Sequence, residues 1–302
     1  MTLDATDDAL RAAVFLHLER LSARHPGGIP SAQINTFTFD GRPMRLIVQP
    51  GIWKPQGLSA ALTIRTTFAG AGAAPYEDEV GSDGLVRYKW RGEDPDHSDN
   101  RALRQAMAQR RPLAYFVGVA RGVYHAIYPA YLAAEERDRQ QFVVAVDPAQ
   151  LMAADLPATA VLPDLRNYAE RLTRLRLHQP VFRARVLRAY ESSCAMCRLR
   201  HAQLLDAAHI IADGQPNGQP VLPNGIALCK IHHAAYDSDI LGVRPDLVIE
   251  VNATVLKEHD GPMLRHGLQA LHGSTLVVPR AQAERPDPQR LEERYEEFRR
   301  AA

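Results

Sequence analysis

The three cysteines of the chain fall into two short motifs that constrain the fold of its C-terminal part. Cys194-Ala-Met-Cys197 is a CxxC motif, and Cys229-Lys-Ile-His232 is a CxxH motif whose cysteine follows Cys197 by 32 residues. Three thiolates and one imidazole are a preferred ligand set of a tetrahedral structural Zn²⁺. The alternative is a redox CxxC, which would open a helix after a thioredoxin-like strand and would need no second motif. The spacing therefore predicts a zinc-containing C-terminal domain.

A second group of polar side chains lies between and just after these motifs. The apolar segment 204–211 predicts a short buried strand that carries His209, and a short helix is predicted to end near Asp237. His232 and His233 are adjacent, so on a helix their side chains point about 100° apart and only one of them faces the zinc. His233 and Asp237 are four residues apart and share one helix face, where a nitrogen and a carboxylate oxygen suit a divalent ion.

The phrase LDAAHII…NGIALCKIHHAAYD resembles the HNH nuclease family, whose fold is the ββα-metal finger, over about 45 residues. The resemblance implies that His209 is the general base that activates water and that Asn224 fastens the loop that positions this base. It also implies that His233 and Asp237 hold a catalytic Mg²⁺ or Mn²⁺ ion. Many members have Asp or His directly before the base histidine, where this chain has Ala208. The metal is then left with two protein ligands.

Arginines are concentrated just before the first cysteine motif. Residues 164–190 contain seven arginines against two acidic residues, which is typical either of a solvated helical face or of a surface that contacts phosphate. We expect the phosphate contacts from the last three arginines, Arg183, Arg185 and Arg188. Asp206 projects to the opposite strand face from the base histidine, and we expect it to orient a neighbouring arginine rather than bind metal.

The N-terminal half has the pattern of a bent sheet with helices at its edge. An apolar stripe, Leu10, Val14, Leu18 and Leu21, predicts a first helix, and residues 100–109 predict another. Five segments rich in β-branched and aromatic residues predict strands at 44–49, 61–68, 85–90, 113–120 and 141–146. The expected class is α+β, with a first domain over 1–150, an Arg-rich helical linker over 151–180, and the metal-binding domain over 181–302, which ends in a helix.

The segment PYEDEVGSDGLVRYKW has a glycine turn between two short strands. A hairpin centred near Ser82 sets Tyr76 opposite Tyr88, and two such rings can sandwich a flat ring, although core tyrosines of an ordinary hairpin fit the same pattern. The order of tyrosine, acidic residue, glycine turn and tyrosine resembles the SRA domain, a PUA-like bent β-barrel that flips a modified cytosine out of DNA. The resemblance implies a modified-base pocket of Tyr76, Glu79 and Tyr88, with Glu79 where the family usually has Asp.

The two resemblances together imply a modification-dependent, type IV-like restriction endonuclease that acts on double-stranded DNA carrying modified cytosine. A homodimer is expected, since one HNH site cuts one strand. Two alternatives stay open: an HNH nicking or homing-type nuclease that reads unmodified DNA, and a non-catalytic DNA-binding zinc protein, which Ala208 favours.

Charge and hydropathy give no sign of a strongly basic protein, a membrane protein or a secreted protein. The net charge of +1 shows no global bias toward nucleic acid. No apolar run approaches the roughly 18 residues of a membrane span, and the N-terminus has no signal-peptide core. We therefore expect a cytoplasmic protein without a membrane partner.

Overall fold

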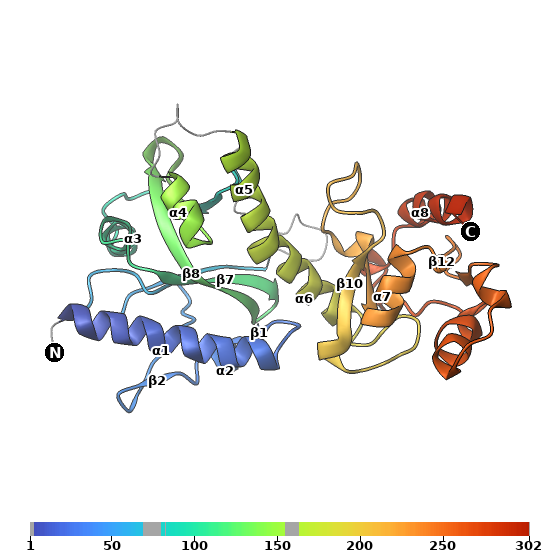
Figure 1. Cartoon of the computed structure of the whole chain (residues 1–302). Helices are drawn as coiled ribbons and strands as arrows, with labels where there is room; N and C mark the ends of the chain where they lie inside the picture. Colours follow the sequence, from blue (N-terminus) through green and yellow to red (C-terminus); the bar gives the residue numbers. More distant parts are fainter. Residues whose placement is uncertain (1–2, 69–79, 82, 155–162, 302) are drawn as a thin grey trace. The chain divides into compact units, whose positions relative to one another are not determined.

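The chain contains two compact units, the first ending at Val181 and the second beginning at Phe182. The computed structural model describes residues 3–68, 80–81, 83–154 and 163–301. Both units combine helices with strands, so the α+β class is confirmed (Figure 1). No helix in the described part of the chain is both long enough and apolar enough to cross a membrane.

The first unit is built on a seven-stranded sheet that curls into a half-barrel (Figure 1). In spatial order the main path is β4 (Ile52–Trp53), β5 (Thr63–Thr66), β7 (Leu113–Ala120), β8 (Val123–Glu136), β9 (Gln141–Ala145) and β6 (Val86–Lys89), and β1 (Ile29–Pro30) pairs with β8. Among the strands that the structure describes, only β5 and β7 pair in parallel. Register shifts in β7 and β8 bend the sheet, as bulges do. Within the described residues the end strands β4 and β6 do not pair with each other, so the sheet stays open.

Helix α1 (Leu3–Arg24) covers one face of this sheet. All four residues of its predicted apolar stripe are buried, and they pack with Phe116 and Tyr124 of the sheet in one cluster. The other regular elements of this region are α2 (Ser31–Ile34), the hairpin of β2 (Thr38–Phe39) and β3 (Arg42–Pro43), α3 (Ser98–Ala108) and the 3₁₀ turn η1 (Arg137–Arg139).

One strand prediction for this unit fails, and one long strand was not predicted. The sequence predicts a strand at residues 44–49, but side chains form hydrogen bonds with backbone groups that a strand would use. Thr63 Oγ1 donates to Leu46 O, and the Ile47 N–H donates to Asn35 Oδ1. The long strand β8 was not predicted from the sequence, and it contains Pro129, a residue that is unusual in a central strand. In the structure this proline lies at the register shift between Ile127 and Ala130, just before the pairing of β8 passes from β7 to β9.

The segment interpreted as a linker is helical where the structure describes it, and it packs on the first unit. It contains α4 (Pro148–Ala154), α5 (Pro163–Thr173) and the π-helical turn η3 (Arg174–His178). Gln150 is buried and its Nε2 donates to Ala169 O and Thr173 Oγ1, while Thr173 Oγ1 donates to Gly84 O. These bonds join the helices to each other and to the sheet hairpin.

The second unit has a strand, strand, helix core around the two cysteine motifs. Strand β10 (Leu205–His209) pairs antiparallel with β11 (Gly225–Cys229), and α7 (Lys230–Asp237) follows directly. Helix α6 (Gln179–Ala189), most of which belongs to this unit, and α8 (Pro288–Ala301) pack against this core through Phe182, Val186 and Leu291. The predicted strand around residues 204–211, the short helix after Cys229 and the C-terminal helix are therefore confirmed.

A second small hairpin and several single turns complete the unit. They are β12 (Leu241–Val243), β13 (Ile249–Val251), and the turns η4 (Ala202–Leu204), η5 (Leu222–Asn224), η6 (Val255–Lys257), η7 (Met263–Leu268), η8 (Gln269–Leu271) and η9 (Gln282–Glu284).

Candidate active site

The two cysteine motifs converge on one point of the second unit. One ligand atom each from Cys194, Cys197, Cys229 and His232 lies within 4.8 Å of all the others. His232 Nδ1 is 3.4 Å from Cys194 Sγ and 3.3 Å from Cys229 Sγ. Zn–S bonds of about 2.3 Å and Zn–N bonds of about 2.0 Å in a tetrahedron place sulfur and nitrogen roughly 3.5 Å apart. The Cys₃His group therefore has the donor set and the spacing of a structural zinc site.

Hydrogen bonds around this group favour metal binding. His232 Nε2 lies 2.7 Å from the Gly267 carbonyl, to which it donates when Nδ1 carries the lone pair that a metal would take. Hydrogen bonds from the Cys229 thiol and from His232 hold the pKa of Cys194 well below its usual value, although burial opposes the shift. A lowered thiol pKa favours the thiolate, which is the form of cysteine that binds zinc.

Asn224 fixes the chain directly after β10. It is fully buried, and its side-chain oxygen accepts the Ile211 N–H at 2.9 Å while its amide donates to Ile211 O at 3.0 Å and Gln219 O at 3.1 Å. Its backbone carbonyl also accepts the Ile210 N–H. Three of these four hydrogen bonds hold Ile210 and Ile211, the exit of the chain from His209, and the fourth holds Gln219.

His209 itself ends β10 with its ring against an aromatic side chain of α6. The ring of Phe182 stacks on the imidazole at a centroid distance of 4.1 Å and an angle of 23°. Gly225 makes this possible, because a Cβ atom there would stand 2.5 Å from Val186 and 2.9 Å from Phe182. Burial lowers the pKa of His209 below 6.5, and the opposing effect of Asp213 is smaller. The imidazole is therefore neutral at pH 7, as a base must be.

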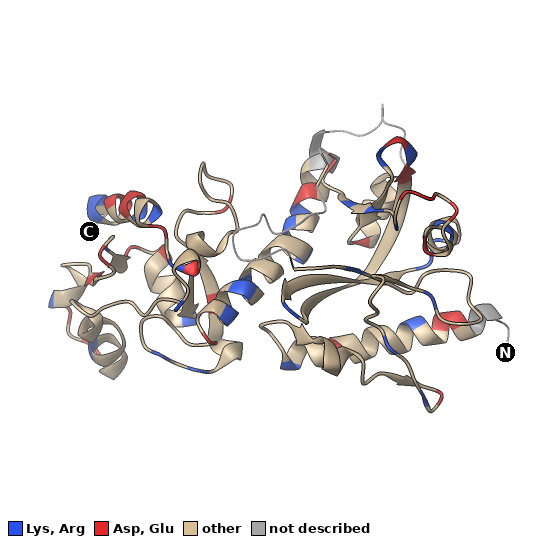
Figure 2. Cartoon of the chain, turned by 180° about the vertical axis from the view of Figure 1, so that it is seen from behind, with Lys and Arg blue, Asp and Glu red and all other residues tan. Residues whose placement is uncertain are grey.

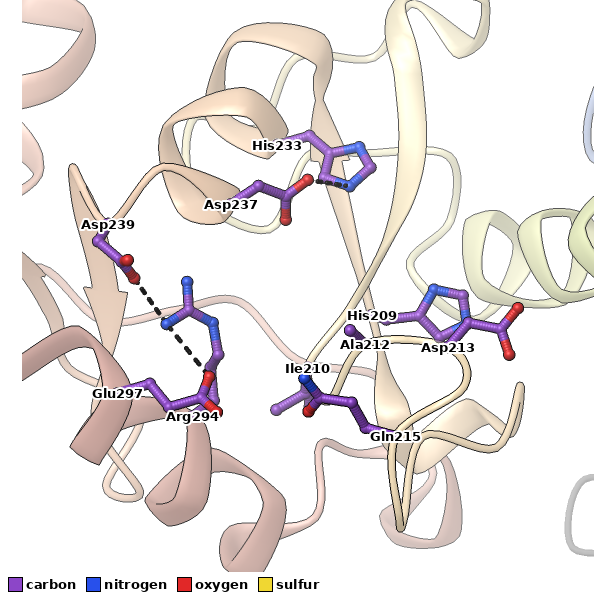
Figure 3. A pocket seen from close by; sticks show the side chains of 10 residues that line it. All are labelled: His209, Ile210, Ala212, Asp213, Gln215, His233, Asp237, Asp239, Arg294 and Glu297. Carbon is purple, nitrogen blue, oxygen red and sulfur yellow. Dashed lines mark ion pairs between the residues drawn. The ribbon is translucent and has the colours of Figure 1, made fainter. Parts of the chain in front are cut away.

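His209 opens into a cavity of about 400 Å³ that α7 lines from another side (Figure 3). His233 Nε2 and Asp237 Oδ2 are 3.3 Å apart on that helix. Two oxygen or nitrogen ligands at about 2.1 Å from an octahedral ion are roughly 3 Å apart, so the pair fits a divalent ion. Ala208 supplies no ligand, and within the described residues no third acidic, cysteine or histidine side chain joins this pair closely enough to complete a group of three.

Asp206 lies behind His233 rather than in the cavity lining. Its Oδ1 is 3.2 Å from Arg183 Nε, which is the pairing with a neighbouring arginine expected from the sequence. Its Oδ2 is 3.8 Å from His233 Nδ1. A carboxylate on the far nitrogen of a ligating histidine orients the ring toward the metal.

The three arginines proposed to contact phosphate occupy different environments on α6. Arg183 donates to Leu205 O at 2.7 Å as well as to Asp206, and Arg185 is only 9% exposed. Arg188, in the last turn, is exposed. Of the three, only Arg188 presents its side chain openly to solvent.

The proposed base pocket is described only in part, because Tyr76 and Glu79 lie outside the described residues. Tyr88 lies on β6 and is 6% exposed, with its hydroxyl donating to Arg65 O at 3.2 Å and its ring edge-on to Tyr115 at 6.2 Å. The glycine turn is present. Its flanking bridge pairs Val80 with Val86, so the hairpin is centred at residue 83, next to the predicted centre.

Sequence reasoning missed two side chains that shape the cavity. Phe182 stacks on His209 from 27 residues upstream, and Arg294 of α8 lines the cavity from the C-terminal end. Neither belongs to a motif, and no local spacing points to them.

Comparison with known proteins adds the following. Residues 194–244 match the family model of the HNH endonuclease. No curated protein matches the sequence. Among solved structures, a modification-dependent restriction endonuclease, TagI, is similar at 18% identity and a TM-score of 0.28, covering 89% of this chain and 92% of that one. A type IV phosphorothioation-dependent restriction endonuclease, ScoMcrA, is similar at 15% identity and a TM-score of 0.22, covering 80% of this chain and 52% of that one.

Proposed function

Since this chain carries an HNH endonuclease domain and is a phosphodiester hydrolase, we propose that it is a restriction endonuclease directed at DNA with a modified cytosine. The observation that carries the cleavage half of the proposal is the single cavity that gathers His209, His233 and Asp237. The recognition half rests on the SRA-like order of residues in the first unit. A homodimer is part of the proposal, because one such site cuts one strand.

The residues of the cavity divide the chemistry between them. His209 takes a proton from the attacking water, for which its lowered pKa keeps the imidazole neutral. Asn224 holds the chain beside it, so that the ring keeps one position. A Mg²⁺ or Mn²⁺ ion held by His233 and Asp237 would polarise the phosphodiester and stabilise the departing oxygen.

The environment of His209 predicts a pH profile. A general base works only when unprotonated, so the cleavage rate should fall on the acidic side as the pH drops through the lowered pKa of His209, below 6.5. Phe182→Ala removes the side chain that covers the His209 ring, so the pKa of His209 should rise toward 6.5. The acidic limb of the pH–rate profile should then move to higher pH. The single-turnover cleavage rate from pH 5 to 8 measures both effects.

A second variant, Phe182→Leu, separates the effect of aromatic stacking on His209 from the effect of apolar burial. Phe182→Leu keeps the apolar cover, and since burial is the largest cause of the shift, its limb should lie closer to that of the wild type. Equal acidic limbs in the wild type and in Phe182→Ala would mean that stacking on Phe182 does not set the ionisation of the base.

Phosphate contacts are proposed at the exposed end of α6. Figure 2 shows basic residues along the helices α5 and α6. Because Arg183 is already paired with Asp206, and Arg185 is buried, Arg188 is the best placed of the three to meet the DNA backbone. Such contacts strengthen binding to DNA regardless of base modification.

The reader pocket is proposed at Tyr76, Glu79 and Tyr88. Extruding a base costs a few kcal/mol of lost stacking and pairing, and each base–aromatic contact returns roughly 1–3 kcal/mol. Glu79 would accept a hydrogen bond from the exocyclic amine of cytosine, which thymine lacks. The hydroxyl bond from Tyr88 to Arg65 O fixes the position of this ring, as either a pocket wall or a core tyrosine requires.

Selectivity for modified DNA tests this pocket. Tyr76→Ala and Glu79→Ala should lose the preference for a duplex with one modified cytosine over the matched plain duplex, while phosphate-driven binding remains. The measurement is the ratio of the two dissociation constants, over a panel of cytosine modifications. Tyr168→Ala, at an exposed tyrosine of α5, is the matched control and should keep the ratio.

Two results would count against the reader proposal. A wild-type ratio in both pocket variants would show that these residues belong to an ordinary hairpin. Equal cleavage of modified and plain DNA by the wild type would favour a nicking or homing-type nuclease that reads unmodified DNA.

A further inference from the structure

The C-terminal helix α8 contributes to the nuclease cavity, although it lies outside residues 194–244. Arg294 and Glu297 project from it into the lining, opposite the walls that carry His209 and His233 (Figure 3). Leu291 and Phe298 anchor the helix in the core, and Phe298 packs so closely on Gly242 that a Cβ atom there would lie 2.5 Å from its ring. The helix is thus a fixed platform for Arg294.

Arg294 contacts the end of α7 through one hydrogen bond and one ion pair. One terminal nitrogen donates to the Tyr236 carbonyl at 2.7 Å, and the other lies 2.7 Å from Asp239 Oδ1. The guanidinium also lies over the Tyr236 ring, 4.9 Å from its centroid. The side chain is 12% exposed. A cation at this place satisfies a carbonyl at the helix C-terminus and complements the helix dipole.

The residue between these two contacts is the proposed metal ligand. Asp237 is the last residue of α7, and its side chain is 60% exposed. Helix ends fray, whereas a metal ligand must be held within about 0.5 Å of its working position. Arg294 donates to the backbone carbonyl of the residue before Asp237 and forms an ion pair with the side chain of the second residue after it, so it holds the chain on both sides of this ligand.

We propose that Arg294 is a positioning residue of the nuclease site, which holds the end of α7 so that Asp237 and His233 present their ligand atoms together. The proposal rests on the function proposed above for these two residues. It requires an arginine, because the planar fork reaches two acceptors and its face stacks on Tyr236, which a lysine cannot reproduce.

The test is the affinity for Mn²⁺ in the absence of DNA, measured on the full chain by equilibrium titration with detection of free Mn²⁺ by electron paramagnetic resonance. Arg294→Ala should weaken the second-unit Mn²⁺ site by about 10-fold or more, the usual cost of losing a residue that supports a ligand. Arg294→Lys should restore part of the affinity. Arg299→Ala, at an exposed arginine of the same helix, should bind as the wild type does.

Cleavage kinetics add a readout that a merely structural role would not produce. At saturating Mn²⁺ the Arg294→Ala enzyme should regain most of its kcat, with an unchanged KM for DNA. An increased KM with wild-type Mn²⁺ affinity would instead place Arg294 on the DNA phosphate and overturn the positioning role.

Two further variants keep the result interpretable. If Arg294→Ala has a lowered melting temperature, Asp239→Asn is the alternative variant, because it removes the ion pair with Arg294. Asparagine tolerates the positive φ of 54° at this position. Asp239→Asn should also weaken Mn²⁺ binding. Asp237→Ala tests the proposed metal site on which the role of Arg294 depends. Wild-type Mn²⁺ binding in Asp237→Ala would refute the proposed metal site itself, whereas weakening in Asp237→Ala alone would refute only the role of Arg294.

Discussion

His209→Ala is expected to reduce the rate of DNA cleavage by at least about 10²-fold, within the usual contribution of a general base. The ring stacks on Phe182, its chain exit is fixed by Asn224, and it opens into the cavity that carries the proposed metal ligands. No other described histidine lines this cavity except His233. The measurement is the single-turnover rate on a supercoiled plasmid at saturating Mn²⁺.

A matched variant controls for nonspecific loss. His201→Ala changes an exposed histidine of the same unit and should cut as the wild type does. DNA binding by His209→Ala should be preserved, since the imidazole acts on water rather than on the DNA backbone. Cleavage by His209→Ala at the wild-type rate would show that another group is the base.

Replacing any one of the three cysteines with alanine is expected to unfold the second unit. In a small metal-stabilised unit the free energy of metal binding is part of the free energy of folding, and here both motifs tie β11 and α7 to the segment after α6. The purified chain should contain one zinc ion. Cys194→Ala should lose the zinc and should become sensitive to protease within residues 182–301.

The neighbouring Arg198→Ala provides the comparison, because this exposed side chain lies outside the Cys₃His group. It should keep the zinc content and the melting temperature of the wild type. Purified wild-type protein without stoichiometric zinc would contradict the assignment, and so would a Cys194→Ala variant that melts as the wild type does.

The second unit could be predicted well because its signals are local. The CxxC and CxxH motifs each span four residues, and the adjacency of His232 and His233 and the four-residue step to Asp237 lie within one short helix. The expected pairing of Asp206 with an arginine follows from strand alternation, which is equally local, and Arg183 is that arginine.

The features that escaped prediction depend on tertiary packing. The stacking of Phe182 on His209 and the contact of Arg294 with Tyr236 join segments far apart in the sequence, and no periodicity encodes them. In the first unit, residues 44–49 have the composition of a strand, but the side chains of Asn35 and Thr63 form hydrogen bonds with their backbone groups. Composition therefore gave the wrong secondary structure there.

The dependence of the cleavage rate on Mn²⁺ concentration tests the central claim, a metal-dependent phosphodiesterase site at His233 and Asp237, most directly. The wild type should be inactive in excess chelator and should recover when Mn²⁺ is added back. His233→Ala and Asp237→Ala should each need about 10-fold more Mn²⁺ or more for half-maximal rate, with partial recovery at high concentration. Cleavage that persists in chelator, or variants whose metal dependence equals that of the wild type, would contradict this assignment.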